Sequence, residues 1–186
     1  MSDIQITAKS DEIEKAVKRL AGIPGGAEKA LSLALNRSLD SAKSEAVRAV
    51  AEEYTVKQKQ VRPTMRAKKS SASNLEAEIV STGASLPLME FKVKPRSDTT
   101  GNRRQPIRVQ VKKGGGGTLT RSFVHAGRVY EREGEERLPI RPLSGPAVPV
   151  MLNNEQVVER VEEKAVETLE KRLDHEVGRL LDKAVK

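Results

Sequence analysis

The sequence predicts an α+β protein with a mainly antiparallel sheet and long packed helices near the N-terminus and at the C-terminus. Apolar residues recur with helical spacing over residues 27–53 and again over residues 154–185. Between them, residues 74–143 alternate apolar and polar positions, which is typical of half-buried strands. Because the chain has 186 residues, a single domain over residues 1–186 accommodates all three regions.

The first residues predict a short strand and then a helix. Ile4 and Ile6 alternate with polar neighbours, and Ser10 is suited to cap a helix that Gly22 to Gly26 ends. The apolar stripe expected for this helix consists of Ile13, Val17 and Leu20.

The long helix 27–53 has a continuous apolar face. That face consists of Leu31, Leu35, Leu39, Ala42, Ala46 and Val50, with Ala34 and Val47 beside it. Asn36 and Arg37 interrupt it, which fits either a hydrogen-bond node or an exposed face. After the helix, Thr55 to Gln58 forms a capping-box pattern that predicts a short helix ending before Pro63.

The middle of the chain predicts strands joined by hairpins. Residues 75–79 and 107–111 alternate apolar and polar side chains, and residues 118–125 and 127–132 supply further strands. Short connections between such strands favour antiparallel pairing.

Residues 129–151 predict a second hairpin followed by a rigid segment. The turn of this hairpin falls at Glu133 to Glu136, where Gly134 can supply a positive φ. Gly145 and Pro146 mark a second turn. Prolines remove amide donors, so this half of the hairpin is expected to be an edge or bulged strand. The prolines of this segment are Pro139, Pro142, Pro146 and Pro149.

The C-terminal helix 154–185 would be roughly 48 Å long at 1.5 Å per residue. Its expected stripe consists of Val158, Val161, Ala165, Leu169, Leu173, Val177, Leu180 and Ala184. A helix of this length exceeds the diameter of a small domain, which indicates that part of it projects or packs on a neighbouring molecule. A long helix wrapped over its own sheet fits the same pattern equally well.

Positive charge is concentrated in the middle of the chain, whose formal net charge is +8. Residues 92–128 hold ten lysines and arginines against Asp98 alone, and they include two loops, 97–106 and 112–118, expected to be flexible. The run from Lys112 to Gly117 lacks the residues of a phosphate-binding loop, so it predicts a mobile cationic hairpin tip. These cations could contact DNA backbone without sequence preference, or an acidic patch on a protein partner; the two interpretations stay equal.

The sequence offers no candidate active site. There is no cysteine, and the two histidines, His125 and His175, lie fifty residues apart. No zinc-protease, nucleophile-elbow or phosphate-loop motif occurs, so no enzyme activity, cofactor or metal is expected. No apolar run approaches the length of a membrane span and the first residues lack a signal-peptide stretch, so no membrane partner is expected.

Two ordered sets of residues carry a resemblance to a known family. The downstream set consists of Phe123, Val129, Tyr130, Arg132, Gly134, Arg137 to Ile140, Leu143, Gly145 and Pro146. The upstream set consists of Ala34 to Leu39, Arg48, Tyr54 to Val56, Leu86 to Leu88 and Phe91. In this order they resemble the phage minor tail protein Z family, the tail completion proteins of long-tailed phages or prophages.

The resemblance implies a structural protein of the virion that finishes the head-proximal end of the tail and supports head–tail joining. Its partners would be the tail terminator or tube end and the head–tail connector, with several copies forming a homo-oligomer in the particle. Its place would be the host cytoplasm during assembly and the tail of the finished virion. A non-specific nucleic-acid-binding accessory protein is the alternative that the basic middle supports.

This interpretation assigns expected roles to particular residues. Genomic DNA must pass the head–tail junction, so the residues expected to contact DNA in the channel are Arg103, Arg104, Lys112 and Lys113. The family match favours a structural node at Asn36 and Arg37. The other residues expected to be structural or to lie in interfaces are Tyr54, Phe91, Phe123, Arg132, Pro139 and Pro146.

Overall fold

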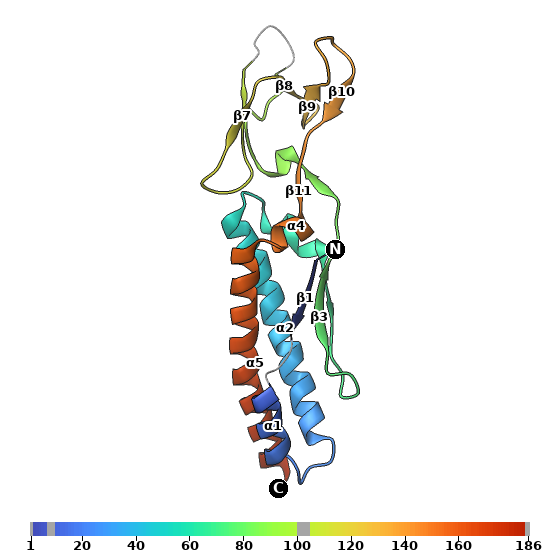
Figure 1. Cartoon of the computed structure of the whole chain (residues 1–186), viewed down its shortest axis with the longest axis vertical. Helices are drawn as coiled ribbons and strands as arrows, with labels where there is room; N and C mark the ends of the chain where they lie inside the picture. The colour runs from blue at the N-terminus through green and yellow to red at the C-terminus, as the bar shows by residue number, and fades with distance from the viewer. Residues whose placement is uncertain (1, 7–9, 100–104, 185–186) are drawn as a thin grey trace.

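The computed structural model describes residues 2–6, 10–99 and 105–184, with side chains from residue 14 onward in the N-terminal part. The molecule is elongated, with a stalk of helices and one small sheet at one end and a head of small sheets at the other (Figure 1). Long helices flank antiparallel strands in the chain, so the predicted α+β class is confirmed.

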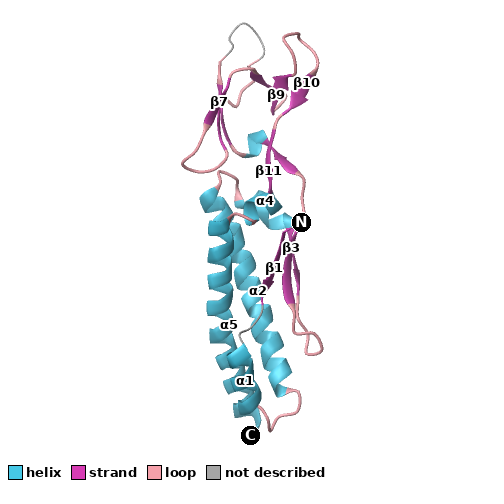
Figure 2. Ribbon diagram, viewed as in Figure 1, coloured by secondary structure: helices cyan, strands magenta, loops and turns pink. Residues whose placement is uncertain are grey.

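The stalk is formed by helices that are far apart in the sequence. The helices, in chain order, are α1 (Ser10–Arg19), α2 (Gly26–Glu53), α3 (Gln58–Val61), α4 (Val148–Leu152) and α5 (Glu155–Ala184), with single 3-10 turns at η1 (Arg62–Thr64) and η2 (Leu88–Glu90). With 28 and 30 residues, α2 and α5 are about 42 and 45 Å long. They run antiparallel and side by side along the whole stalk (Figure 2).

The predicted apolar face of α2 is confirmed, since all eight of its residues are buried. On α5 the buried positions are Val157, Val161, Ala165, Leu169, Leu173, Val177 and Leu180. Val158 and Ala184 were expected in that stripe, but Val158 is half-buried and Ala184 is exposed. The buried stripe begins at Val157 and not at Val158, because Val157 lies four residues before Val161 and therefore on the same side of the helix, which faces α2.

Helix α5 packs on α2, which neither interpretation of its length anticipated. Ser38 Oγ donates a hydrogen bond of 2.6 Å to the carbonyl oxygen of Ala165 in the buried interface. Farther along, Thr168 Oγ1 donates to Ser41 Oγ at 3.1 Å. Small residues of α2, among them Ser38, Ala42 and Ala46, face Ala165 and its neighbours on α5 and allow this close approach, so the core of the stalk is a helix pair.

Two local predictions in the N-terminal half were wrong. Val17 is 47% exposed, whereas Ala16 and Leu20 are buried, because α1 turns its small alanine toward α2 and α5. Thr55 does not cap a helix: α3 begins after Lys57 without a side-chain cap. The Thr55 hydroxyl instead donates to the carbonyl oxygen of Gln110 at 2.5 Å and therefore joins the stalk to the head.

The strands form four small antiparallel sheets in the described part of the chain, with the strand orders β1-β3-β2, β5-β6-β7, β10-β9-β8 and β11-β4. Their bounds are β1 (Ser2–Ile6), β2 (Met65–Lys68), β3 (Ala77–Ser81), β4 (Ser85–Pro87), β5 (Lys92–Lys94), β6 (Ile107–Gln110), β7 (Gly117–Leu119), β8 (Ser122–His125), β9 (Arg128–Arg132), β10 (Ile140–Pro142) and β11 (Ser144–Ala147).

The first sheet belongs to the stalk. It lies along α2, and β3 buries Ala77 and Ile79 in the alternating pattern that the sequence predicts, while Leu75 precedes the strand and is 36% exposed. The other sheets form the head, together with η2, and the segment through β11 and α4 returns the chain to α5.

The hairpin of β8 and β9 turns at Ala126 and Gly127, which both have positive φ, at 47° and 73°. Positive φ at both central residues is the requirement of a tight hairpin turn. Gly134 was expected to serve this purpose in the next hairpin, but it is not among the residues with positive φ. A longer loop joins β9 to β10, and β10 is an edge strand as its prolines predict.

Gly145 lies within a strand, so the turn expected at Gly145 and Pro146 is absent from the described structure. The register between β11 and β4 shifts between Ser144 and Ala147, which places Pro146 in a bulge where no amide donor is needed. A Cβ on Gly145 would overlap the ring of Phe91, so close packing explains the glycine.

Candidate functional site

Three cations gather on one face of the sheet β5-β6-β7. Lys94 is paired with Arg108 across β5 and β6, and Lys92 lies two residues before Lys94 on the same strand. Because side chains alternate along a strand, all three point to the same side of the sheet. The opposite side carries the buried Val93 and Ile107. We call Lys92, Lys94 and Arg108 the cationic face.

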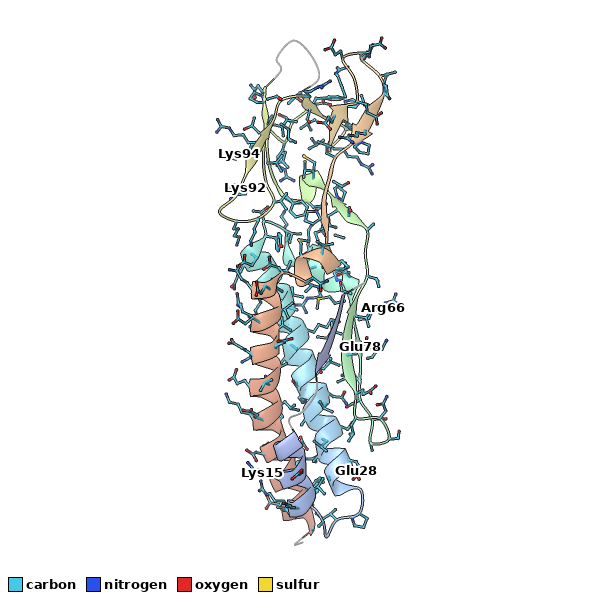
Figure 3. All side chains as sticks on the ribbon, in the orientation of Figure 1. Lys15, Glu28, Arg66, Glu78, Lys92 and Lys94 are labelled. Atoms are coloured by element: carbon cyan, nitrogen blue, oxygen red, sulfur yellow. The ribbon has the colours of Figure 1, made fainter. Side chains whose placement is uncertain are left out.

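The cationic face is exposed and lacks compensating acids. All three residues are solvent-exposed, and none forms an ion pair with a carboxylate in the described part of the chain. Figure 3 shows Lys92 and Lys94 on the outer flank of the head, directed away from the body of the molecule. Like charges this close repel one another, so the arrangement is suited to an anionic ligand.

A hollow of about 390 Å³ lies over this face, lined by the three cations together with Gln110, Thr118 and the backbone of Gly115 to Gly117. The glycine run forms one wall of the hollow. A Cβ on Gly116 would lie 3.2 Å from the carbonyl oxygen of Val109, so a side chain there would push this wall away from β6.

A second hollow of about 630 Å³ lies next to the first, on the side of the stalk. It is lined by Thr55, Lys57, Met89, Glu90, Phe91, Lys92, Arg96, Gln110 and Lys113. Arg96 has a structural task there, since its Nη2 donates to the carbonyl oxygen of Met89 at 2.7 Å. Lys92 and Gln110 line both hollows.

The four residues expected to contact DNA have different surroundings. Arg103 and Arg104 lie outside the described residues. Lys112 Nζ lies 3.6 Å from Oε2 of Glu53, so its charge is partly compensated. Lys113 is exposed, while its backbone N–H donates to the carbonyl oxygen of Glu53 at 2.8 Å. The end of α2 therefore holds the backbone at the start of the glycine run.

An aromatic and cationic group holds the outer hairpin of the head. The rings of Phe123 and Tyr130 stack with centroids 5.9 Å apart, and the guanidinium of Arg132 lies 5.4 Å from the Phe123 ring centre. The same guanidinium donates to the carbonyl oxygen of Arg137 at 2.9 Å. The structure thus brings together three residues that the family resemblance singled out.

The loop between β9 and β10 carries three exposed acids at the outer end of the head. Glu133, Glu135 and Glu136 are exposed and form no ion pair within the described residues, whereas Glu131 is paired with Arg141 at 2.7 Å. We call these three glutamates the acidic tip. Leu138 in the same loop is 64% exposed.

Asn36 and Arg37 are neighbours in the sequence but lie in different environments. Asn36 Nδ2 donates to the carbonyl oxygen of Ser70 at 3.0 Å, and its Oδ1 accepts the Ser70 N–H at 2.9 Å. Ser32 donates to the same carbonyl oxygen at 3.2 Å. This group fastens the end of β2 to α2. Arg37 is exposed, so the structural node expected there stays a prediction, and it would have to form with another molecule.

The remaining expected residues lie at joints of the fold. Tyr54 ends α2 and forms an isolated bridge with Lys112. Phe91 is 1% exposed and fills the base of the head. The carbonyl oxygen of Pro139 accepts a hydrogen bond from the Glu133 N–H at 3.2 Å, which closes the outer loop. Pro146 is in the bulge of β11.

Charged pairs on the stalk shift pKa values without forming a site. Hydrogen bonding and charge attraction from Arg160 lower the pKa of Glu52, and Arg160 also donates to Glu45 at 2.6 Å. These pairs connect α5 to α2. On the outer side of α5, hydrogen bonds from Lys164 and Lys171 lower the pKa of Glu167 to about 2.

The described residues hold no cluster of three or more histidine, cysteine, aspartate or glutamate side chains suited to a metal ion. His125 Nδ1 lies 3.0 Å from Oδ2 of Asp98 on the exposed edge of β8. Among the helices that the structure describes, none is both long and apolar enough to span a membrane.

The cationic face could not be predicted as a unit, although its members belong to the basic stretch of residues 92–128. Lys92-Val93-Lys94 alternates charged and apolar residues, which was the signal for two lysines on one side of a strand. The partner Arg108 could not be assigned, because its position depends on the register between β5 and β6.

Comparison with known proteins leads to one family. No curated protein and no solved structure matches the chain. The family model described as prophage minor tail protein Z (GPZ) matches residues 11–186, which is nearly the whole chain. The family is one of structural proteins of the phage tail, which places its members in the tail of the virion. The chain belongs to the prophage minor tail protein Z family.

Proposed function

We propose that this protein completes the head-proximal end of the phage tail and supports the joining of the tail to the head. Several copies bind the tail terminator or tube end and offer a surface to the head–tail connector. This assembly takes place in the host cytoplasm. Family membership supplies the class of protein, and the distribution of charge over the fold is the observation that carries the specific role.

Charge is segregated along the molecule. The described residues of the head, 85–99 and 105–147, contain eleven lysines and arginines and six acids, while the whole chain has a net charge of +8. More than half of the excess positive charge is therefore in the described part of the head, at the end of a stiff pair of helices about 42 to 45 Å long. A basic end on a rigid support is suited to a junction through which DNA passes.

Within this proposal the basic loops line the DNA channel. Arg103, Arg104, Lys112 and Lys113 remain the residues that we assign to contacts with phosphate, and Lys113 supports the assignment because it is exposed. Such contacts act on the backbone charge and carry no sequence preference.

The test of this role is add-back to tails that were assembled without the protein. Tails and filled heads are mixed with wild-type protein or with a variant in which Arg103, Arg104, Lys112 and Lys113 are all serine. Wild-type protein is expected to restore joining and infectivity. The variant is expected to restore joining but to change DNA retention or ejection. Joining that proceeds equally well without any added protein would contradict the proposed function.

A further inference from the structure

We propose that the cationic face of one copy binds the acidic tip of a second copy of this chain, so that the heads join side by side in the assembled particle. This inference rests on the proposed function, since it specifies the contact between copies at the tail end. It names one occupant for the hollow of about 390 Å³ over Lys92, Lys94 and Arg108.

The two surfaces complement each other in charge and in number. Three exposed cations line the hollow, and three exposed glutamates, Glu133, Glu135 and Glu136, form the tip. Within the described chain neither group has ion-pair partners of its own. Carboxylates that meet exposed lysines and an arginine form charge-assisted hydrogen bonds, and Arg108 can bind a carboxylate with two parallel bonds.

The two surfaces lie too far apart to meet within one molecule. Figure 3 shows Lys92 and Lys94 on one flank of the head, and Figure 1 shows the loop between β9 and β10 on the opposite flank. A contact between different surfaces on opposite flanks is heterologous. Repetition of such a contact builds a ring when the rotation closes, and an open helix when it does not.

The acidic tip is held ready for binding. Arg132 donates to the carbonyl oxygen of Arg137 at 2.9 Å, and Arg121 Nη2 donates to that of Gly134 at 2.8 Å. The Glu133 N–H bonds to Pro139 across the base of the loop. A loop held in place by these hydrogen bonds loses little conformational entropy on binding.

The composition of the tip favours a protein partner. Its exposed glutamates would repel DNA, and Arg121 and Arg132, which contact the loop, use their guanidinium groups on its carbonyl oxygens. Leu138 is 64% exposed beside them and offers an apolar contact that a neighbouring protein can cover. The cationic face on its own would also attract DNA phosphate, so the experiment separates these two occupants.

The test is a charge-swap series in the full-length protein. One variant is K92E/K94E, a second is E133K/E135K, and a third combines all four changes. The matched control is K15E/K18E, which reverses two exposed cations of α1 in the stalk, away from the head. Circular dichroism checks that each variant is folded. The copies bound per end of tails lacking the protein are then counted by cryo-electron microscopy at a sub-saturating concentration.

Each single-surface variant is expected to lower the number of bound copies by about tenfold, because like charges then face each other across the contact. The combined variant is expected to regain the wild-type number, since its reversed surfaces are complementary again. The K15E/K18E control is expected to bind as the wild type does. Equal binding by all variants, or no recovery in the combined variant, would overturn the inference.

A second measurement identifies DNA as the occupant if the inference is wrong. Binding of a labelled DNA duplex by the isolated proteins is expected to fall by the same amount in K92E/K94E and K15E/K18E, because both variants lower the net charge by four. A larger loss of duplex binding in K92E/K94E than in K15E/K18E, together with no recovery of tail-bound copies in the combined variant, would assign the cationic face to DNA. Failure of the wild-type protein to bind tails at all would contradict the proposed function itself.

Discussion

Gly145 lies directly against the ring of Phe91: a Cβ at position 145 would overlap Cε2 and lie 3.0 Å from Cδ2 and Cζ. Phe91 is 1% exposed and occupies the base of the head, next to the strand that leads back to the stalk. This contact therefore joins two segments that are more than fifty residues apart in the sequence. It ties the head to the segment that continues into α4 and α5.

A methyl group at position 145 tests this contact. Gly145→Ala is expected to lower the free energy of unfolding by about 1–3 kcal/mol, because the buried ring has to move out of its place. Gly178→Ala is the control, since a Cβ there meets nothing within 4 Å and alanine is preferred over glycine in a helix. Urea unfolding of both variants measures the difference. Equal stability of Gly145→Ala and wild type would show that the ring is not confined.

Two leucines with opposite exposure separate the core of the stalk from the surface of the head. Leu169 of α5 is 2% exposed, and Leu138 in the outer loop is 64% exposed. Leu169→Ala is expected to cost about 2–5 kcal/mol, because it leaves a cavity between α2 and α5. Leu138→Ala is expected to leave stability nearly unchanged and to weaken only contacts with other molecules. Thermal unfolding of the two variants side by side tests this, and similar losses in both would contradict the account of the stalk.

Asn36 and Arg37 are neighbours in the sequence but are expected to have different roles. Asn36→Ala removes two hydrogen bonds to the backbone of Ser70 and is expected to destabilise the fold by about 1–3 kcal/mol. Arg37→Ala changes an exposed side chain and is expected to stay within about 0.5 kcal/mol of the wild type. If Arg37 contacts the tail, its loss will appear in binding to tails instead. Denaturant unfolding and tail binding, measured on the same two proteins, decide between these roles.

Glu167 on α5 predicts a dependence of stability on pH. Hydrogen bonds from Lys164 and Lys171 lower the pKa of Glu167 from 4.5 to about 2, so the folded state favours the ionised carboxylate. This stabilisation is fully present above about pH 4.5 and is lost as the pH falls toward 2. The stability difference between wild type and Glu167→Gln is therefore expected to shrink over this window.

Glu167 is exposed to solvent, so the effect is small and salt is expected to reduce it. Unfolding curves at several pH values between about 2 and 6 measure the difference, with low and high salt as the comparison. A difference that stays constant with pH would mean that the two lysines do not stabilise the folded protein through this carboxylate.

The long helices could be predicted because their signal is local. Leu31, Leu35 and Leu39 repeat every four residues, and a helix places such residues on one side whatever it packs against. The partner of that side could not be predicted from the pattern. The structure shows α2 and α5 packed on each other along the stalk, which depends on contacts between residues more than one hundred positions apart, such as Ser38 and Ala165.

Features that depend on tertiary contacts escaped prediction. Gly134 and Gly145 both looked like turn residues, yet the turn with positive φ is at Ala126 and Gly127, and Gly145 makes room for Phe91. The Thr55 hydroxyl was available for a helix cap, but Gln110 offered a carbonyl oxygen across the junction of stalk and head. For Gly145 and Thr55, a distant segment determined the use of a locally versatile residue.

The candidate site was predictable in composition but not in arrangement. The basic stretch from residue 92 to 128 was evident from the sequence, and it contains the cationic face. The pairing of Lys94 with Arg108 required the register of β5 and β6, which a short strand of three residues does not specify. The acidic tip carried no signal beyond a charged turn.

The measurement that tests the central claim most directly is the location and number of bound copies on tails assembled without this protein. Purified wild-type protein is added to such tails, and single particles are imaged by cryo-electron microscopy. The account predicts several copies at one end of each tail, the end that joins the head, with their basic heads around the channel. Protein that binds along the tube, binds the opposite end, or ignores tails while binding DNA would contradict it.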